Sequence, residues 1–368
     1  MATRSARAAR EASSFPPGWP RLAALALVVV TVLVSAVGVA PAAAEDPTFV
    51  AWSDLLPGIS SVYDPAASNL CAKGSVKCVD AVIKEMTKRF NPLVSVCDHN
   101  AMFSLTYLRT TEEYRRTIED DTFFSDTAFI NHQDALFGSY YFNAWDDYRA
   151  GRLASVPQAW QIAFAAADGH KVSGSGNLFL GMSAHVNRDL PYVLADIGLV
   201  KPDGSSRKPD HDKVNQFLNR VIEPLLAEAG RRLDPTVESS NIQGTTMDET
   251  GTMQLLVAWR EQAWRNAEAL VNAPTAASRA LVAQQIETTA AIEAQLLVAS
   301  TAYSAADAGA AQWAASSLNA TAHLYSWSAM QGLLSAASQA RQQNVLNGLL
   351  PSSGAATRDA YCASHWNT

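Results

Sequence analysis

The chain has 368 residues, of which 48% are hydrophobic, so it is long enough to bury a substantial core. Its formal net charge is −7; residues 1–44 carry +3, from four arginines and one glutamate, which leaves −10 for the remainder. Because nucleic-acid binding requires a basic surface, this charge argues against a nucleic-acid partner. Alanine is abundant and apolar residues recur at helical spacing, which predicts an all-α fold.

The first 44 residues have the pattern of a secretory signal peptide. A basic region ends at Arg21, residues 22–40 contain no charged side chain, and Ala42-x-Ala44 is a typical cleavage pattern before Glu45. The apolar run is also close to the length of a membrane span, so an uncleaved N-terminal anchor is the alternative. Either way the sequence predicts an exported protein whose membrane contact, if any, is made by this segment.

The four cysteines fit an exported protein in which disulfides form. Cys71 and Cys78 flank a short polar segment that a disulfide could close, which leaves Cys97 and Cys362 to pair. Four cysteines allow three connectivities, so this pairing is a preference. A zinc site is the alternative, but the sequence contains no Cys-x-x-Cys pair, and disulfides are favoured.

Helical periodicity begins near Val76, after a turn-rich stretch at 45–74, and continues in segments to about Leu346. Asn91-Pro92 is expected to end the first helix, and the tail at 351–368 is expected to be irregular. We therefore predict a single bundle-like helical domain, with a core at 45–300 and Ala-rich helices and a tail at 301–368 packed on it. The predicted helices cover residues 76–90, 97–119, 126–148, 157–164, 176–196, 214–226, 253–271 and 276–346.

The stretch from Gly176 to Pro191 is predicted to be the central helix. His185 and Asp189 are four residues apart, so they lie one turn apart on the same helix face. Pro191 has no N–H to donate to the carbonyl of Asn187, so we expect a kink and a free carbonyl beside the pair.

Metal ligation is the functional interpretation of this pair, because imidazole and carboxylate bind zinc, manganese or iron. Asp134, which lies mid-helix among apolar and aromatic residues, is a third candidate, since a buried carboxylate needs a partner. The candidate ligands of a divalent metal are therefore His185, Asp189 and Asp134. The candidate accessory residues are Asp98, which also suits a helix cap, Tyr107, Arg109, which could instead pair with an acid, and Asn187.

Two functions follow from these residues. The first is a metal-dependent hydrolase in which a metal-bound water is the nucleophile. The second is a non-catalytic helical protein of the cell envelope, with an unknown ligand or partner, in which His185 and Asp189 form a structural pair. Other catalytic signatures, such as Gly-x-Ser-x-Gly or His-Glu-x-x-His, do not occur in the sequence, and no other cofactor is predicted.

The run from Leu180 to Pro191 resembles the signature M-x-A-H-[IV]-N-x-D-L of the bacterial domain-of-unknown-function family 5995. The resemblance covers roughly residues 95–300 and implies an all-helical domain without an established activity. Three further segments are similar to family positions: Phe103-x-x-x-Tyr107-Leu-Arg-x-Thr110, Asp134-x-x-Phe137 and Ala263-Trp264-x-x-Ala267.

A much weaker similarity links the chain to zinc-dependent phospholipase C and single-strand nuclease proteins. These are exported helical proteins that use a His-x-x-x-Asp pair among their zinc ligands. This sequence lacks their second pair, His-x-x-x-Glu, and Trp52 does not lie at the predicted mature N-terminus, where that family has a metal-binding tryptophan.

Overall fold

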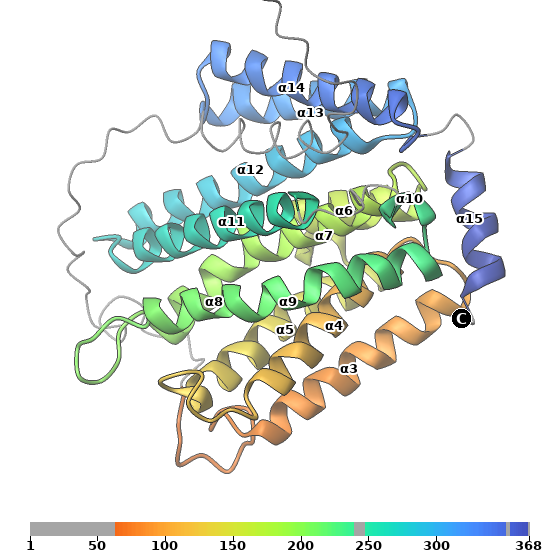
Figure 1. Cartoon of the computed structure of the whole chain (residues 1–368). Coiled ribbons are helices and arrows are strands. Elements are labelled where there is room, and N and C mark those ends of the chain that lie inside the picture. The colour runs from red at the N-terminus through yellow and green to blue at the C-terminus, as the bar shows by residue number, and fades with distance from the viewer. Residues whose placement is uncertain (1–62, 239–246, 351–353, 367–368) are drawn as a thin grey trace, which may run out of the picture.

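The computed structural model describes residues 63–238, 247–350 and 354–366, and these residues form helices and no β-strand (Figure 1). The predicted all-α class is thereby confirmed. The predicted signal segment, residues 1–44, lies outside the described residues. The elements are α3 (Val76–Ser95), α4 (Ala101–Thr117), α5 (Thr127–Arg149), the 3₁₀ turn Leu153–Ser155, α6 (Gln158–Asp168), α7 (Gly174–Ser183), the π-helical segment Ala184–Asp189, α8 (Leu190–Ile197), α9 (Lys208–Arg232), α10 (Pro235–Glu238), α11 (Met247–Val271), α12 (Ala276–Thr301), α13 (Ala305–Ala322), α14 (Trp327–Leu346) and α15 (Gly354–His365).

The helices are stacked in layers, with α3, α4 and α5 on one side and α13 with α14 on the opposite side (Figure 1). Between them lie α7, α8, α9, α11 and α12. The π-helical segment 184–189 contacts α5, α6, α11 and α12 in addition to its neighbours α7 and α8. The stretch that the sequence predicts to be central is therefore surrounded by helices on several sides.

The central stretch changes from α-helical to π-helical hydrogen bonding before Pro191. Residues 184–189 form a π-helical segment between α7 and α8, and Pro191 occupies the first turn of α8. Proline is tolerated in the first turn of a helix, because the backbone N–H that it lacks is not needed there for a helical hydrogen bond. The predicted interruption next to Pro191 is thus present, as a π-helical turn. Such turns are frequent at functional sites because they redirect the side chains that follow.

Helix α3 runs further than its sequence suggests. Ser75 caps its N-terminus by accepting a hydrogen bond from the Lys77 N–H, and the helix continues from Val76 through Pro92 to Ser95. Asn91-Pro92 was expected to end it. Pro92 is exposed, so water can bond the carbonyl that proline leaves free, while Leu93 and Val94 are buried and hold the last turn in place.

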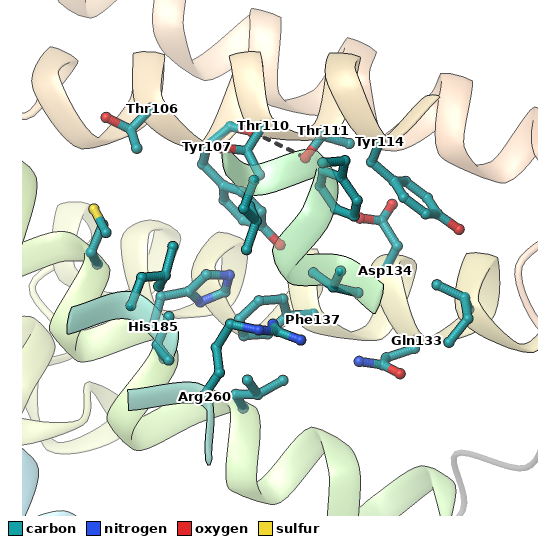
Figure 2. A pocket seen from close by; sticks show the side chains of 18 of the residues that line it. Thr106, Tyr107, Thr110, Thr111, Tyr114, Gln133, Asp134, Phe137, His185 and Arg260 are labelled. Carbon is teal, nitrogen blue, oxygen red and sulfur yellow. Dashed lines mark hydrogen bonds between the residues drawn. The ribbon is translucent and has the colours of Figure 1, made fainter. Parts of the chain in front are cut away.

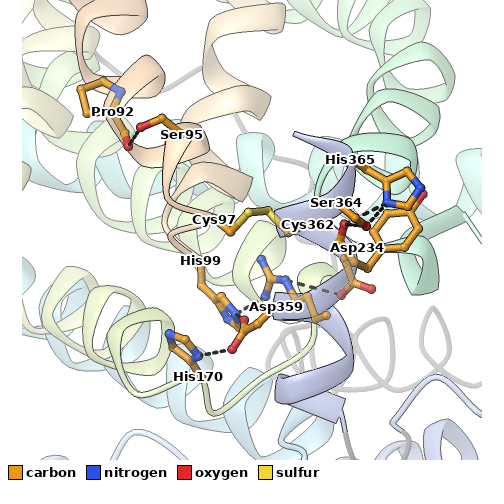
Figure 3. The surroundings of a disulfide bond; sticks show 12 residues. Pro92, Ser95, Cys97, His99, His170, Asp234, Asp359, Cys362, Ser364 and His365 are labelled. Carbon is orange, nitrogen blue, oxygen red and sulfur yellow. Dashed lines mark hydrogen bonds and ion pairs between the residues drawn. A yellow bond between two sulfur atoms is a disulfide. The ribbon is translucent and has the colours of Figure 1, made fainter. Parts of the chain in front are cut away.

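The C-terminal tail was predicted to be irregular, and the structure corrects this. Residues 354–365 form α15, which the disulfide Cys97–Cys362 ties to the segment before α4 (Figure 3). The second disulfide joins Cys71 to Cys78, so the pairing is the one that the sequence favoured. Two disulfides are typical of proteins that fold in an oxidising compartment outside the cytoplasm.

Within residues 63–238, 247–350 and 354–366, no helix has both the length and the apolar character needed to cross a bilayer.

Gly181 of α7 lies against the side chain of Phe103 of α4. A Cβ atom at position 181 would lie 2.3 Å from Phe103 Cγ, closer than any ordinary contact. We expect Gly181→Ala to lower the free energy of unfolding by about 1–3 kcal/mol, the usual cost of overpacking. Denaturant unfolding measures this; Gly309→Ala, where nothing lies within 4 Å of the added Cβ, is the control and should not be destabilised.

Candidate functional site

His185 and Asp189 form a buried hydrogen-bonded pair. His185 Nδ1 lies 3.0 Å from Asp189 Oδ2, and the same oxygen accepts a hydrogen bond of 2.8 Å from Trp160 Nε1. The other oxygen, Oδ1, accepts a bond of 3.0 Å from Arg188 Nη1. Because Asp189 only accepts, the proton of a neutral His185 sits on Nδ1, and the lone pair is left on Nε2.

Burial keeps the imidazole uncharged. Desolvation lowers the pKa of His185 below its usual value, and the hydrogen bond from Nδ1 to Asp189 opposes this only in part. The ring stacks on Phe137 with 3.5 Å between the ring centroids and meets the edge of Tyr107 at 4.4 Å. These contacts fix the direction in which Nε2 points.

Among the described residues, Nε2 of His185 is one of three buried polar atoms that lack a hydrogen-bond partner and belong to residues lining a cavity of about 130 Å³ (Figure 2). The other two are Tyr107 Oη and Asp134 Oδ2, and none of the three has a hydrogen-bond partner among the described residues. An unsatisfied buried polar atom costs about 1–3 kcal/mol, so three of them around one cavity point to a bound polar group. The cavity is lined by Phe103, Thr106, Tyr107, Thr110, Thr111, Tyr114, Ile130, Gln133, Asp134, Phe137, Met182, His185, Val186, Leu190, Val214, Phe217, Leu218, Leu256 and Arg260.

Asp134 and Tyr107 can both donate hydrogen bonds near neutral pH. Burial raises the pKa of Asp134 to about 7, so a large part of this carboxyl is protonated at pH 7. The pKa of Tyr107 is raised well above its usual value by burial first, and then by Asp134 and Asp189. The cavity therefore offers two potential donors and, at His185, one strong acceptor.

The three predicted metal ligands are not arranged as one ligand set. Asp134 and His185 both line the cavity, whereas Asp189 lies behind the imidazole and does not line it. The oxygens of Asp189 already accept bonds from His185, Trp160 and Arg188. A metal ion shared by all three residues would have to displace these donors, so the donor set does not fit a common ion. Metal binding by His185 without Asp189 stays a prediction, which a measurement of metal content tests.

Of the four accessory candidates, only Tyr107 lines the cavity. Arg109 makes a bidentate pair with Glu228, at 2.7 and 2.8 Å, and a further bond to Glu112. The side chain of Asn187 donates to Ser183 and to Glu293.

Asp98 is also engaged away from the cavity. Its side chain accepts a bond of 2.8 Å from the N–H of Asn100 and so closes the turn before α4. Arg109, Asn187 and Asp98 therefore have local structural partners.

A different group of potential ligands lies at the end of the bundle, beside α15. Of the described residues, His99, His170 and Asp359 place one nitrogen or oxygen each within 4.8 Å of one another (Figure 3). Arg358 Nη1 lies 2.9 Å from His99 Nδ1, and His99 Nε2 lies 2.7 Å from Asp359 Oδ1. Because arginine only donates, His99 carries its proton on Nε2, the atom that a metal would need.

Metal binding at this group would require moving that proton to Nδ1, against the N–H of Arg358. Burial, followed by the charge of Arg358, lowers the pKa of His99 to about 3. The group thus suits the docking of α15 better than the binding of an ion.

Two residues of the site were not anticipated from the sequence. Trp160 holds Asp189 through its indole N–H, and Arg260 of α11 lines the cavity. Arg260 has a detectable signal, because it lies between Leu256 and Trp264 on the apolar side of its helix, where a charge is uncommon. Trp160 has none, since a tryptophan in an apolar stripe is usually core.

Comparison with known proteins gives one match. A model described as "Family of unknown function (DUF5995)" matches residues 79–300. All residues that line the cavity fall within this range, whereas α13, α14 and α15 follow it. No curated protein and no solved structure matches the chain, and the weaker similarity to zinc-dependent phospholipase C proteins stays unconfirmed.

Proposed function

This chain belongs to the DUF5995 family, whose function is unknown, and we propose that it is a hydrolase in which His185, oriented by Asp189, activates water inside the buried cavity. The observation that carries the proposal is the free Nε2 of His185, buried at the cavity while Nδ1 is held by a carboxylate. This arrangement fixes the tautomer that a general base needs.

The remaining polar atoms support hydrolysis of a carbonyl compound. His185 Nε2 would take a proton from water as the water oxygen bonds to the carbonyl carbon. The negative charge that develops on the carbonyl oxygen would accept hydrogen bonds from Tyr107 and protonated Asp134. When the leaving group departs, the imidazolium returns the proton to it, so no external acid is required. The apolar lining would exclude bulk water and strengthen these interactions.

Hydrolysis of small aryl esters, such as phenyl acetate, tests the proposal on the whole chain with its disulfides intact. We expect His185→Ala to lower kcat/KM by about a hundredfold or more, the usual contribution of a general base. His170→Ala is the matched control, because this residue lies at the α15 end and does not line the cavity. Absence of hydrolysis by the unaltered protein, or an unchanged rate in a folded His185→Ala variant, would exclude the proposed role.

Metal analysis of the unaltered protein and of His185→Ala tests the metal-dependent alternative. Stoichiometric zinc, manganese or iron that disappears with His185 would mean that Nε2 binds an ion, and a metal-bound water would then replace the His185-activated one. No bound metal in either protein, or the same amount in both, would favour the proposal that His185 and Asp189 activate water without a metal ion.

Export is the remaining part of the proposal. It is supported by the two disulfides and by the basic and apolar pattern of residues 1–44. The intact mass of the protein recovered outside producing cells would show whether the chain begins at Glu45.

A further inference from the structure

Arg260 is a buried cation without an anionic partner. The residue is 5% exposed, and among the residues whose side chains the structure describes, no carboxylate lies within 4.0 Å of its guanidinium nitrogens. The charge of Asp212 acts on it only from a greater distance. Its bonds go to neutral acceptors: Nε donates to Asn215 Oδ1 at 2.8 Å and Nη2 to the His211 carbonyl at 2.6 Å. A buried charge is costly unless it is paired, so an anion bound in direct contact with this guanidinium would stabilise it.

The neighbouring residue His211 does not neutralise the positive charge of Arg260. His211 Nε2 lies 3.2 Å from the Arg260 carbonyl, which can only accept, and Nδ1 faces Arg260 Nη2. Burial, followed by the charge of Arg260, lowers the pKa of His211 well below its usual value, so the ring is neutral. Burial lowers the pKa of Arg260 itself to about 10, which leaves the guanidinium protonated near neutral pH.

The guanidinium is positioned to meet a ligand. Arg260 lines the same cavity as Tyr107, Asp134 and His185, and in Figure 2 it points toward the side chain of Gln133. Most of the other lining residues are aliphatic or aromatic. A volume of about 130 Å³ is close to that of an engineered apolar cavity of about 150 Å³ that accommodates benzene.

We propose that the cavity binds a small, largely apolar carboxylate whose anionic end pairs with Arg260 and whose apolar body packs on the aromatic lining. Arg260 can hold a carboxylate through charge-assisted hydrogen bonds, which are stronger than neutral ones. The inference rests on the cavity of the proposed function and names its ligand class, but it does not depend on catalysis by His185. In a hydrolysis, the substrate would carry this carboxylate in addition to the bond that is cleaved.

Calorimetric titration compares benzoate and phenylacetate with their neutral counterparts benzamide and phenylacetamide. We expect the carboxylates to bind at least about tenfold more tightly, a difference of about 1.4 kcal/mol. Arg260→Gln should remove this preference, whereas Arg260→Lys should keep part of it. Arg265→Gln is the control, because Arg265 lies on the same helix but is half exposed and bonded to Glu261 and Glu268.

Equal affinity for carboxylates and amides, or no binding of either, would overturn the inference. This comparison uses the unaltered protein and remains decisive if Arg260→Gln fails to fold. The two proposals separate in His185→Ala, which should retain the preference for carboxylates while losing hydrolysis. Carboxylate binding without any hydrolysis by the unaltered protein would keep the ligand class and exclude the catalytic role.

Discussion

Asp134→Asn is expected to stabilise the protein at pH 8 by about 2–4 kcal/mol while leaving its stability near pH 4 almost unchanged. Burial raises the pKa of the folded carboxyl from 3.8 to about 7, and at about 1.4 kcal/mol per pKa unit this shift corresponds to at most about 4.5 kcal/mol. We expect less than this limit, because Asp134 as a whole residue is only partly buried. Between these two pKa values the folded chain holds a proton that the unfolded chain has released. Stability therefore falls as the pH rises from about 4 to 7, and the full penalty is present above pH 7.

Denaturant unfolding of both proteins at pH 4, 6 and 8 measures the effect. Asparagine cannot ionise, so the gain should grow through this window. Glu293→Gln is the matched control: burial also raises the pKa of Glu293 to about 7, but this residue does not line the cavity. It should show the same pH dependence of stability without changing carboxylate binding. A gain from Asp134→Asn that does not vary with pH would mean that Asp134 is already ionised or paired in the folded state.

A buried carboxyl that destabilises the fold at neutral pH is more typical of functional sites than of packing. Asp134 Oδ2 and His185 Nε2 have no hydrogen-bond partner among the described residues, and the Arg260 guanidinium bonds only neutral acceptors there. All three residues line one cavity. Core packing alone would favour apolar side chains at such positions, because each unmet group lowers stability. Their placement around one space supports a shared ligand.

The helices were predictable because most of them bury one face. In α3 the stripe Val79, Val82, Met86 and Phe90 is buried, as its spacing indicates. Helix α15 was not predictable, because it has little apolar periodicity and is held by a disulfide and by the buried Arg358. Contacts with residues far away in the sequence hold α15 in place, and such contacts cannot be inferred from the sequence pattern of the helix itself.

The candidate site was only partly predictable for the same reason. His185 and Asp189 are local neighbours, so helical spacing predicted their contact. Sequence also singled out Tyr107 and Asp134, which line the cavity, but it proposed Arg109 and missed Arg260, whose position on the apolar side of α11 was the available signal. The fold shows that Glu228 pairs with Arg109, whereas no carboxylate among the described side chains lies within 4.0 Å of the Arg260 guanidinium.

Substitutions of Asp189 are expected to separate its structural role from its role in catalysis. Asp189→Ala leaves Trp160 Nε1 and His185 Nδ1–H without an acceptor inside the protein. We expect it to cost about 3–5 kcal/mol of unfolding free energy, as when one partner of a buried charged network is removed. Arg188 is less affected, because it keeps Glu287 at 2.7 Å.

Asp189→Asn should keep the fold and still abolish most of the hydrolysis. The amide oxygen can take the place of Oδ2 and accept from Trp160 and His185, while the amide nitrogen displaces Arg188, which is partly exposed. The tautomer is kept, but the negative charge that stabilises the imidazolium is lost. We expect kcat/KM to fall about a thousandfold, less than the roughly ten-thousandfold loss seen when a triad histidine also takes the wrong tautomer.

The pH dependence of any remaining rate distinguishes this role from packing. Asp189 raises the pKa of His185 against the effect of burial, so its loss should lower that pKa further and move the acidic limb of the pH–rate profile to lower pH. Asp196→Asn, which alters a carboxylate bonded to Tyr140 outside the cavity, should leave that limb in place. A folded Asp189→Asn variant with an unchanged rate and profile would show that Asp189 serves only to hold His185 in the core.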